Sequence, residues 1–538
     1  MITDISNNNT YDAIIVGAGF AGLYQLICLR DQLGLKCLII ETGDDVGGTW
    51  YWNRYPGARC DTESHAYSYY FSDELLKEWS WTERYPGHAE IREYINFVAK
   101  KFDLKKDILF NNKVTSSTFN ENENNWSLIT ENGNQFKAKY LISAVGCLSN
   151  ANIPNIKGLE TFEGKYYHTG NWPKNDVSFT NKKVGQIGTG STGIQAVPVI
   201  ANNAKHLTVF QRTANYSVPA RNQPLKDDFK EHVKADYKNY REFLKRTPNG
   251  HPFDISERLV SDVNEDERNE IYEKAWEKGG LQFRATFQDL VTNLDANNTA
   301  AEFIKQKIRK TVLNKKFADI LSDIDHPYAG KRPPIDSHYF EAFNRDNINL
   351  VDLRADPIKH IDEKGIQTKQ DHFDLDIIVF ATGYDAMTGP LLNLNITGKD
   401  NLKLSDYWKE GPKTYLGLQI AGFPNLFTIT GPGSPSVLTN MPMAIEQHVE
   451  WIRDCISHMN QKGYSLIETN NKVSEEWGQE VNKVANKTLL PKVKHSWYLG
   501  ANIPGKPQVF MPYAGGLPKY NDICNDVKKN DYLGFNLS

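Results

Sequence analysis

Two stretches of the chain share one order of apolar and polar positions, and the first lies near the start of the sequence. Tyr11–Val16 is a short, β-branched apolar run that predicts a buried strand. Glycines follow from Gly17, and Leu23–Arg30 has a helical pattern. Lys36–Glu41 then predicts a second strand. Strand, glycine turn, helix and strand in this order are typical of a Rossmann-type unit.

The same order recurs in the middle of the chain. Lys183–Ile187 predicts a strand, glycines begin at Gly188, a helical pattern covers Ile194–Ala204, and His206–Gln211 predicts the next strand. The expected fold class is therefore α/β, with two Rossmann-like dinucleotide-binding domains.

Two further predicted strands end in glycine and suggest how the domains are joined. Lys139–Gly146 and Leu375–Gly383 each look like a returning strand at a crossing between domains. We expect the second domain to be inserted into a split first domain. Residues from about 225 to 330 are charged and helical in pattern, which predicts a helical insertion that helps to cover the site. The expected parts are 1–146, 147–382 and 383–538.

Composition excludes several partners. A chain of 538 residues is too long for one core, and its 40% apolar and 24% charged content is ordinary for a globular protein. A net charge of −4 and a pI near 6.4 give no electrostatic case for binding nucleic acid. Met1–Thr10 lacks a leader pattern, and no apolar stretch is long enough for a bilayer. We expect no nucleic-acid or membrane partner, and a monomer or weak oligomer.

The cysteines form no functional pattern. They include no C-x-x-C pair, and no His/Cys spacing is typical of zinc. Few, scattered cysteines are typical of a reducing compartment, so we expect a cytoplasmic protein without a metal. They are Cys28, Cys37, Cys60, Cys147, Cys455 and Cys524.

Each glycine loop has the G-x-G-x-x-G spacing that holds a pyrophosphate. Gly17 permits a tight turn, Gly19 lets the backbone approach the phosphates, and Gly22 lets helix and strand pack closely. Free N–H groups at the start of the helix favour negative charge. The second loop, Gly188–Gly193, repeats the spacing, so the sequence predicts two nucleotide cofactors.

Two longer motifs carry a family resemblance. Residues 162–172 read F-x-G-x-x-x-H-x-x-x-W, with His168 and Trp172, and residues 47–61 read G-G-x-W-x-x-x-x-Y-P-G-x-x-x-D, ending at Asp61. Both resemble fingerprints of type I Baeyer–Villiger monooxygenases, and the resemblance covers essentially the whole chain. The chain is similar to the cyclohexanone and phenylacetone types. Its 431–442 loop looks more like the phenylacetone type, so the choice of substrate stays open.

The resemblance implies NADPH- and O₂-dependent oxidation of a small-molecule ketone to an ester or lactone through a flavin C4a-peroxide. FAD supplies the difficult chemistry, and the protein supplies charge, geometry and exclusion of water. By the same resemblance Arg332 is the catalytic arginine, oriented by Asp61, and it stabilises developing negative charge. The 162–172 fingerprint is expected on an interdomain linker. We therefore favour a role for His168 and Trp172 in coupling domain movement to cofactor position over a general-base role for His168.

The residue at the end of the second strand distinguishes the two sites. Glu41 lies 19 residues after Gly22, and Arg212 lies 19 residues after Gly193. An acid suits a free ribose hydroxyl, whereas arginine suits a 2′-phosphate. We expect FAD at the first site and NADPH at the second, where the resemblance adds Lys331 as a phosphate partner. The alternative for Arg212 is a solvated charge at a strand end.

The expected site residues come from both loops and from the motifs. Leu438 on the 431–442 loop is the expected ketone contact, and Trp497 lies on a segment that resembles the mobile loop over the nicotinamide. The residues expected around FAD are Gly17, Gly19, Phe20, Gly22, Glu41, Thr49, Trp50, Trp52, Asp61, Tyr67 and Val114. Those expected around NADPH are Gly188, Thr189, Gly190, Ser191, Thr192, Gly193, Arg212, Thr213, Lys331, Arg332 and Trp497.

Three other functions share parts of this pattern. A flavin N- or S-monooxygenase has both glycine loops, but its fingerprint usually lacks the tryptophan found here at 172. A pyridine nucleotide–disulfide reductase needs a redox-active cysteine pair, which the spacing does not offer. A non-enzymatic flavin-binding redox sensor would not need the Asp61 and Arg332 segments.

Overall fold

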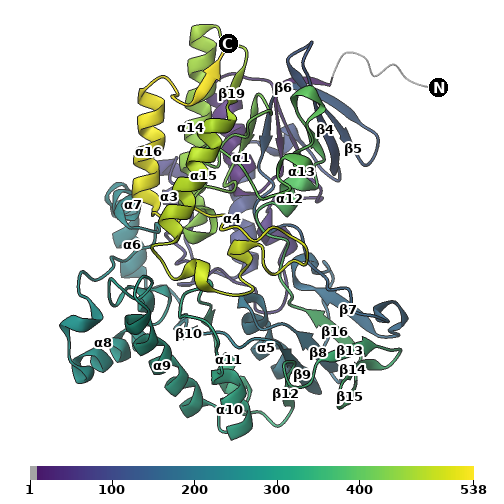
Figure 1. The fold of residues 1–538 in the computed structure, drawn as a ribbon, viewed down its shortest axis with the longest axis vertical. Coiled ribbons are helices and arrows are strands. Elements are labelled where there is room, and N and C mark those ends of the chain that lie inside the picture. The colour runs from purple at the N-terminus through teal and green to yellow at the C-terminus, as the bar shows by residue number, and fades with distance from the viewer. Residues whose placement is uncertain (1–8) are drawn as a thin grey trace.

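The protein is built on two sheets that contain parallel strands. The structure is a computed structural model and describes residues 9–538. In the view of Figure 1 the first sheet, with α1 (Phe20–Leu26) and α14 (Met441–Lys462), occupies the upper half, and the second sheet lies at the lower right. The α/β class is confirmed. The expectation about a leader at Met1–Thr10 falls largely on residues outside the described part.

The first sheet has eight strands, in the order β17-β4-β5-β6-β1-β2-β3, with β18 also paired to β6. At its centre β1 is parallel to both β2 and β6, and Ile14 faces Leu38 on one side and Leu141 on the other. Strands β17 and β18 arrive from much later in the chain. The strands are β1 (Thr10–Val16), β2 (Cys37–Ile40), β3 (Ile108–Leu109), β4 (Val114–Asn120), β5 (Asn125–Thr130), β6 (Gln135–Ser143), β17 (Ile396–Thr397) and β18 (Leu426–Thr428).

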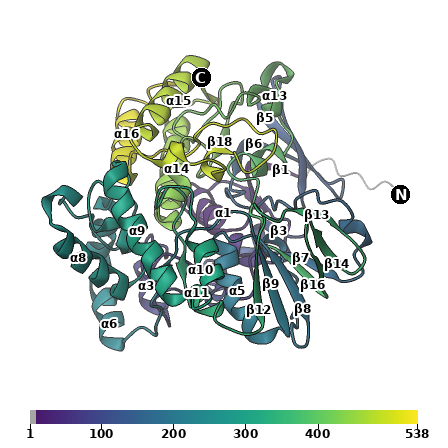
Figure 2. The ribbon, with the colours of Figure 1, turned by 60° about the horizontal axis from the view of Figure 1, so that its bottom comes forward.

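The second sheet has five strands, all parallel, in the order β12-β9-β8-β16-β7 (Figure 2). A small antiparallel sheet of β13 (Ile358–Ile361), β14 (Gly365–Thr368) and β15 (His372–Asp374) precedes β16 in the chain. The five strands are β7 (Lys165–His168), β8 (Lys183–Ile187), β9 (His206–Gln211), β12 (Ile348–Asp352) and β16 (Ile377–Phe380).

The helical run between β9 and β12 forms as expected and occupies the left and lower part of Figure 1. Its helix α7 packs against α16 (Leu517–Lys529), where Leu244 and Leu517 share an apolar cluster. The run therefore contacts the C-terminal part of the chain as well as the second sheet. Its helices are α6 (Asp227–Ala235), α7 (Tyr237–Arg246), α8 (Glu265–Lys278), α9 (Leu294–Thr311) and α10 (Lys315–Ser322).

Both expected helices after the glycine loops begin three residues earlier than their sequence patterns, and the helix after the second loop begins at Ser191, not at Ile194. The helix after the first glycine loop begins at Phe20, not at Leu23, because the glycine motif itself forms the first turn. It ends in a π-helical segment, Ile27–Gln32. The remaining elements are α2 (Thr49–Trp52), α3 (Asp73–Glu78), α4 (His88–Lys101), α5 (Ser191–Asn203), α11 (Tyr339–Ala342), α12 (Gly389–Leu392), α13 (Leu404–Tyr407), α15 (Asn471–Ala485), β10 (Val218–Pro219), β11 (Ile335–Asp336), β19 (Ile467–Thr469) and β20 (Phe535–Leu537).

Within residues 9–538, no helix has the length and apolar character needed to cross a membrane. The same residues bring together no cluster of three or more metal-ligating side chains. All six cysteines are buried free thiols.

Candidate functional site

The first glycine loop is packed too tightly for any other residue type at two positions. Gly17 has φ of 105°, and a Cβ there would lie 2.7 Å from the carbonyl oxygen of Ala144, just after β6. A Cβ on Gly22 would lie 1.9 Å from the carbonyl oxygen of Gly17. The loop, strand and helix therefore meet as closely as a pyrophosphate cradle requires, and the residues present fit a bound dinucleotide.

The second loop repeats this packing. Gly188 has φ of 109°, and its Cβ would lie 2.3 Å from the carbonyl oxygen of Ala381, just after β16. A Cβ on Gly193 would lie 2.3 Å from the oxygen of Gly188. Helix α5 begins at Ser191, next to Thr192, so free N–H groups border the loop. Thr189 and Thr213 also meet here, because the Thr189 hydroxyl donates to the Thr213 carbonyl at 3.0 Å.

Glu41 lies where the first site needs an acceptor. Its two carboxylate oxygens accept the backbone N–H groups of Ala18 and Gly43, each at 2.7 Å. Burial raises the pKa of this carboxyl, and the backbone hydrogen bonds offset only part of the rise. A carboxylate has about four acceptor sites, so these two bonds leave room for a ribose hydroxyl.

The charge of Arg212 acts on Lys331, although the two residues come from segments more than 100 positions apart. Arg212 is exposed just after β9, and Lys331 is half-buried. Burial lowers the pKa of the Lys331 ammonium and the positive charge of Arg212 lowers it further, whereas Asp325 opposes both. Two neighbouring cations match a phosphate group, which is doubly charged near neutral pH.

An aromatic cluster borders the first loop. The indole N–H of Trp50 on α2 donates to the hydroxyl of Tyr67 at 3.1 Å, and the ring of Phe20 meets that of Tyr67 edge-on at 5.3 Å. Thr49 and Trp52 lie on the same short helix, where Thr49 is exposed and Trp52 is partly buried. Val114, by contrast, lies at the start of β4 in a different apolar cluster.

The segment 47–61 joins the two glycine loops. The Tyr55 hydroxyl donates to Gln195 Oε1 on α5 at 2.7 Å, and Gln195 Nε2 donates to the Arg59 carbonyl at 3.1 Å. Gly57 has φ of 81°, and a Cβ there would lie 2.4 Å from the Gln195 carbonyl oxygen. The segment that follows the first nucleotide motif is therefore docked on the helix of the second.

Asp61 and Arg332 form a two-point ion pair at the end of this segment. Arg332 Nε lies 2.6 Å from Asp61 Oδ2, and Arg332 Nη2 lies 2.7 Å from Asp61 Oδ1. Arg332 Nη1 donates to the Val437 carbonyl at 2.8 Å. Burial by itself would raise the pKa of Asp61, but the charge and hydrogen bonds of Arg332 outweigh it and the pKa is lowered. Burial by itself would lower the pKa of Arg332, but the charge and hydrogen bonds of Asp61 outweigh it and the pKa is raised. Both groups are therefore ionised.

Four residues around this pair were missed by sequence analysis. Burial, together with the charges of Arg332 and Arg284, lowers the pKa of His251 to about 3, so this imidazole is neutral. Burial raises the pKa of Tyr498, the neighbour of Trp497, to about 12, and the same two guanidinium groups partly offset the rise. Asn249 and Arg284 complete the group. Asn249, His251 and Arg284 stand in no recognisable motif, because only folding brings the helical run to Arg332. Tyr498 lies on the segment that resembles the mobile loop, where only Trp497 was singled out.

The 162–172 fingerprint does not lie on a linker, so that expectation is wrong. Lys165–His168 form β7, the edge strand of the second sheet, where their backbone pairs in parallel with β16. His168 Nδ1 accepts the Gly170 N–H at 2.9 Å, and burial lowers the pKa of this imidazole to about 4. Beyond the strand, the Trp172 N–H donates to the Trp52 carbonyl at 3.3 Å. The fingerprint thus links the second sheet to the segment 47–61.

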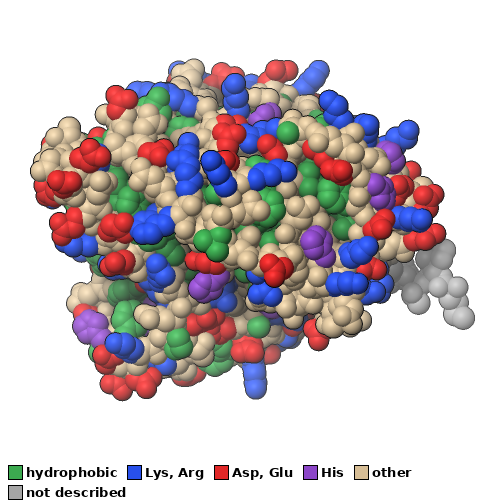
Figure 3. Space-filling view, turned by 90° about the horizontal axis from the view of Figure 1, so that it is seen from below, with side chains coloured by type: hydrophobic (Ala, Val, Ile, Leu, Met, Phe, Trp, Pro, Cys, Tyr) green, Lys and Arg blue, Asp and Glu red, His purple; other side chains and the backbone are tan. Residues whose placement is uncertain are grey.

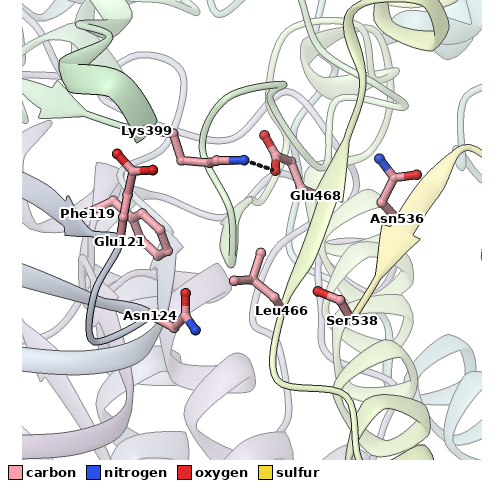
Figure 4. A pocket seen from close by; sticks show the side chains of 8 residues that line it. All are labelled: Phe119, Glu121, Asn124, Lys399, Leu466, Glu468, Asn536 and Ser538. Carbon is pink, nitrogen blue, oxygen red and sulfur yellow. Dashed lines mark hydrogen bonds and ion pairs between the residues drawn. The ribbon is translucent and has the colours of Figure 1, made fainter.

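A separate cavity of about 240 Å³ lies between the β4–β5 hairpin and the C-terminal strands (Figure 4). Lys399 and Glu468 form an ion pair of 3.2 Å across it. None of its lining residues belongs to the expected site, and it contributes nothing to the chemistry described above.

Comparisons with known proteins agree with this geometry. The family model described as "Flavin-binding monooxygenase-like" matches residues 11–223. The cyclohexanone 1,2-monooxygenase of an Acinetobacter species is 43% identical, over 99% of this chain and 98% of that protein. A phenazine N-monooxygenase of Lysobacter antibioticus is 40% identical, over 99% of this chain and 98% of that protein.

Solved structures give the same result. The crystal structure of a complex of OTEMO with FAD and NADP has a TM-score of 0.94 and 39% identity, over 98% of this chain and 99% of that one. The fold and the two cradles thus define a flavin-binding monooxygenase that uses FAD and NADPH. More narrowly, the chain belongs to the type I Baeyer–Villiger monooxygenases.

Proposed function

We propose that this enzyme uses NADPH and O₂ to oxidise ketones to esters or lactones. The observation that carries the proposal is the Arg332–Asp61 pair, held at the end of the segment that joins the two nucleotide cradles. A fixed positive charge at this place suits a reaction in which negative charge develops on oxygen.

The two cofactors fit different residues. We assign FAD to the first loop, with Glu41 on the ribose and the Phe20–Trp50–Tyr67 cluster beside the ring system. We assign NADPH to the second loop, with Arg212 and Lys331 on the 2′-phosphate. When bound, the flavin takes hydride from NADPH and activates oxygen.

Arg332 keeps donors in reserve for the reacting atoms. A guanidinium has five N–H groups, and those on Nε, Nη1 and Nη2 that meet Asp61 and Val437 account for three. One N–H on Nη1 and one on Nη2 remain. Asp61 fixes the plane of the guanidinium, so these two donors have a defined direction toward a carbonyl oxygen.

His251 and His168 are poor candidates for proton transfer at neutral pH. Their pKa values of about 3 and about 4 lie far below 7, so neither imidazole carries the second, acidic proton, and each is a weak base. We propose that the charges of Arg332 and Asp61, which stay ionised, control protonation in this site. The exclusion of water limits it further.

The direct test combines two measurements on one enzyme preparation. NADPH consumption is followed with and without cyclohexanone, and the product is identified by mass spectrometry. We expect ketone-stimulated consumption and a lactone. Stimulation without lactone would contradict the proposal.

A second candidate function is oxidation of a ring nitrogen, and the 40% identical phenazine N-monooxygenase favours it. The same assay with phenazine in place of the ketone separates the two. An N-oxide together with no lactone would make N-oxidation the function of this site.

We further propose three domain segments, 1–146, 147–382 and 383–538, and a cytoplasmic monomer or weak oligomer. The six buried free thiols support a reducing compartment. On the face in Figure 3 the apolar side chains are scattered among charged ones, which supports a protein without a large permanent interface.

A further inference from the structure

Arg284 is a cation without an acidic partner. It lies on the 3₁₀ turn Leu281–Ala285, which leads away from α8. Its Nη2 donates to Asn249 Oδ1 at 2.9 Å, and this is the one hydrogen bond of its guanidinium to residues 9–538. No acidic group in that part of the chain forms an ion pair with it. Arg332, in contrast, is balanced by Asp61.

Arg284 carries this unbalanced charge on a half-buried side chain near Arg332. Burial lowers the pKa of its guanidinium, and the charge of Arg332 lowers it further, whereas Tyr328 and Tyr498 oppose the shift. A buried charge is stable only when it is paired or well hydrogen-bonded. Most of the N–H groups of Arg284 have no protein acceptor, so a ligand can supply both the charge and the acceptors.

Arg284 and Arg332 are anchored to the same turn. Arg284 holds Asn249, and Asn249 Nδ2 donates to the Leu438 carbonyl at 2.7 Å. Arg332 Nη1 donates to the neighbouring Val437 carbonyl at 2.8 Å. The two guanidinium groups therefore flank residues 437 and 438, the turn that carries the expected ketone contact.

We propose that Arg284 is a specificity-determining residue that binds the carboxylate of a keto-acid substrate. The carboxylate pairs with Arg284, and the ketone carbonyl of the same molecule then faces the free N–H groups of Arg332. Asp61 already neutralises Arg332, so Arg284 is the cation left for the substrate anion. This inference rests on the proposed function, since it names the substrate class of that same site.

The kinetic test uses a matched pair of substrates. We compare kcat/KM for 4-oxocyclohexane-1-carboxylate with kcat/KM for its methyl ester. We expect the wild-type enzyme to prefer the acid. Arg284→Met should lower the acid-to-ester ratio by about ten- to hundredfold, the range that one charge-assisted hydrogen-bonded pair spans. Arg284→Lys should retain part of the preference, because it keeps the charge but loses the planar fork.

The control is Arg258→Met, which removes the same charge from the helical run. Arg258 is exposed and pairs with Glu267 at 2.6 Å. The acid-to-ester ratio of the Arg258→Met enzyme should equal that of the wild type. Equal ratios for the wild type and Arg284→Met would overturn the inference.

A binding measurement separates this inference from the proposed reaction. Cyclohexanecarboxylate and cyclohexanecarboxamide are titrated calorimetrically into FAD-loaded enzyme saturated with NADP⁺, so that the phosphate site is filled. We expect the carboxylate to bind more tightly than the amide in the wild type, and the difference to vanish in Arg284→Met. If that holds while no ketone yields an ester, the proposed reaction fails and the anion site stands. If the carboxylate binds both enzymes equally, the anion site fails whatever the reaction.

Discussion

At the scale of single residues, the chemistry depends on which charges are balanced. Arg332 and Asp61 neutralise each other through two hydrogen bonds, yet two guanidinium N–H groups stay free. A balanced pair tolerates burial, and the free donors act on the substrate. Removal of either partner would leave an uncompensated charge, which costs about 3–5 kcal/mol in a buried pair and somewhat less here, where both side chains are partly exposed.

Arg332→Ala should retain the ability to bind FAD but lose ester formation. Loss of one preorganised donor to an oxyanion costs about 10²–10³ in rate, and loss of the charge adds to this. Flavin reduction by NADPH should persist, because hydride transfer depends mainly on how the two cofactors are placed. Anaerobic reduction and ester yield are measured separately.

Arg332→Lys is the control for folding, because it keeps the charge facing Asp61. It should load with FAD as well as the wild type does and still make little ester, since an ammonium cannot reproduce the two-point geometry. Ester formation near the wild-type rate in Arg332→Ala would assign the catalytic cation to another residue.

Arg212→Ala and Lys331→Ala should each weaken the binding of NADPH far more than the binding of NADH. A charge-assisted hydrogen bond contributes roughly 1.5–3 kcal/mol, so each change should raise the KM for NADPH by about ten- to hundredfold. Arg212 is exposed and screened by salt, so its effect should lie at the lower end of this range. Steady-state kinetics with both cofactors provide the comparison. A similar rise in the KM for NADH would mean that neither residue recognises the 2′-phosphate.

At the scale of elements, the turn at 436–438 contains a strained residue. Ser436 has φ of 41° although it is not a glycine, and such a conformation costs of order 1–3 kcal/mol. The Arg332 and Asn249 hydrogen bonds to Val437 and Leu438 hold the turn in place. A strained turn held from both sides presents its side chain in one fixed direction.

Leu438→Ala should therefore change which ketones are preferred and leave the type of reaction unaltered. One methylene in an apolar pocket is worth about 1–3 kcal/mol, and this change removes several carbon atoms. We expect kcat/KM to shift toward bulkier ketones across a panel of ring sizes. An unchanged order across the panel would exclude the turn from the ketone pocket.

The sequence pattern predicted the elements that depend on residues close together in the chain. The strand–glycine–helix units formed at both loops, because alternating or apolar runs and glycine spacing act over a few residues. The starts of α1 and α5 were each misplaced by three residues, and the fingerprint strand β7 was assigned to a linker. The pairing of β17 and β18 with the first sheet also escaped notice. It depends on contacts between residues nearly 300 positions apart, which no window of sequence contains.

At the scale of the whole molecule, the site is assembled from segments that no single motif contains. Asp61 and Arg332 are 271 residues apart, and Arg332 and Val437 are 105 apart. The family resemblance supplied Asp61, Arg332 and Lys331 together. His251 and Arg284 come from the helical run, whose sequence carries only a charged helical pattern, so their place beside Arg332 could be learned only from the fold.

The contact between the two nucleotide cradles yields a prediction for the whole molecule. Gln195 on α5 accepts from Tyr55 and donates to the Arg59 carbonyl, and it is the polar side chain on which the segment 53–61 docks. Gln195 Oε1 also accepts the Arg59 backbone N–H at 3.4 Å. Gln195→Ala removes all three hydrogen bonds without touching either glycine loop. The distance between the bound cofactors should then vary more, and a misplacement near 1 Å costs about 10²-fold in rate.

We expect Gln195→Ala to slow anaerobic flavin reduction by NADPH by about ten- to hundredfold, while the Kd for NADP⁺ changes little because Arg212 and Lys331 are intact. Asn203→Ala is the matched control. It lies on the same helix, is exposed, and donates only to the Val199 carbonyl within that helix. It should reduce flavin at the wild-type rate. If Gln195→Ala also reduced the flavin at the wild-type rate, other contacts, such as the Trp172–Trp52 hydrogen bond, would hold the two cradles in place. If both variants lost NADP⁺ affinity, the change would lie in α5 itself and not in the contact between the cradles.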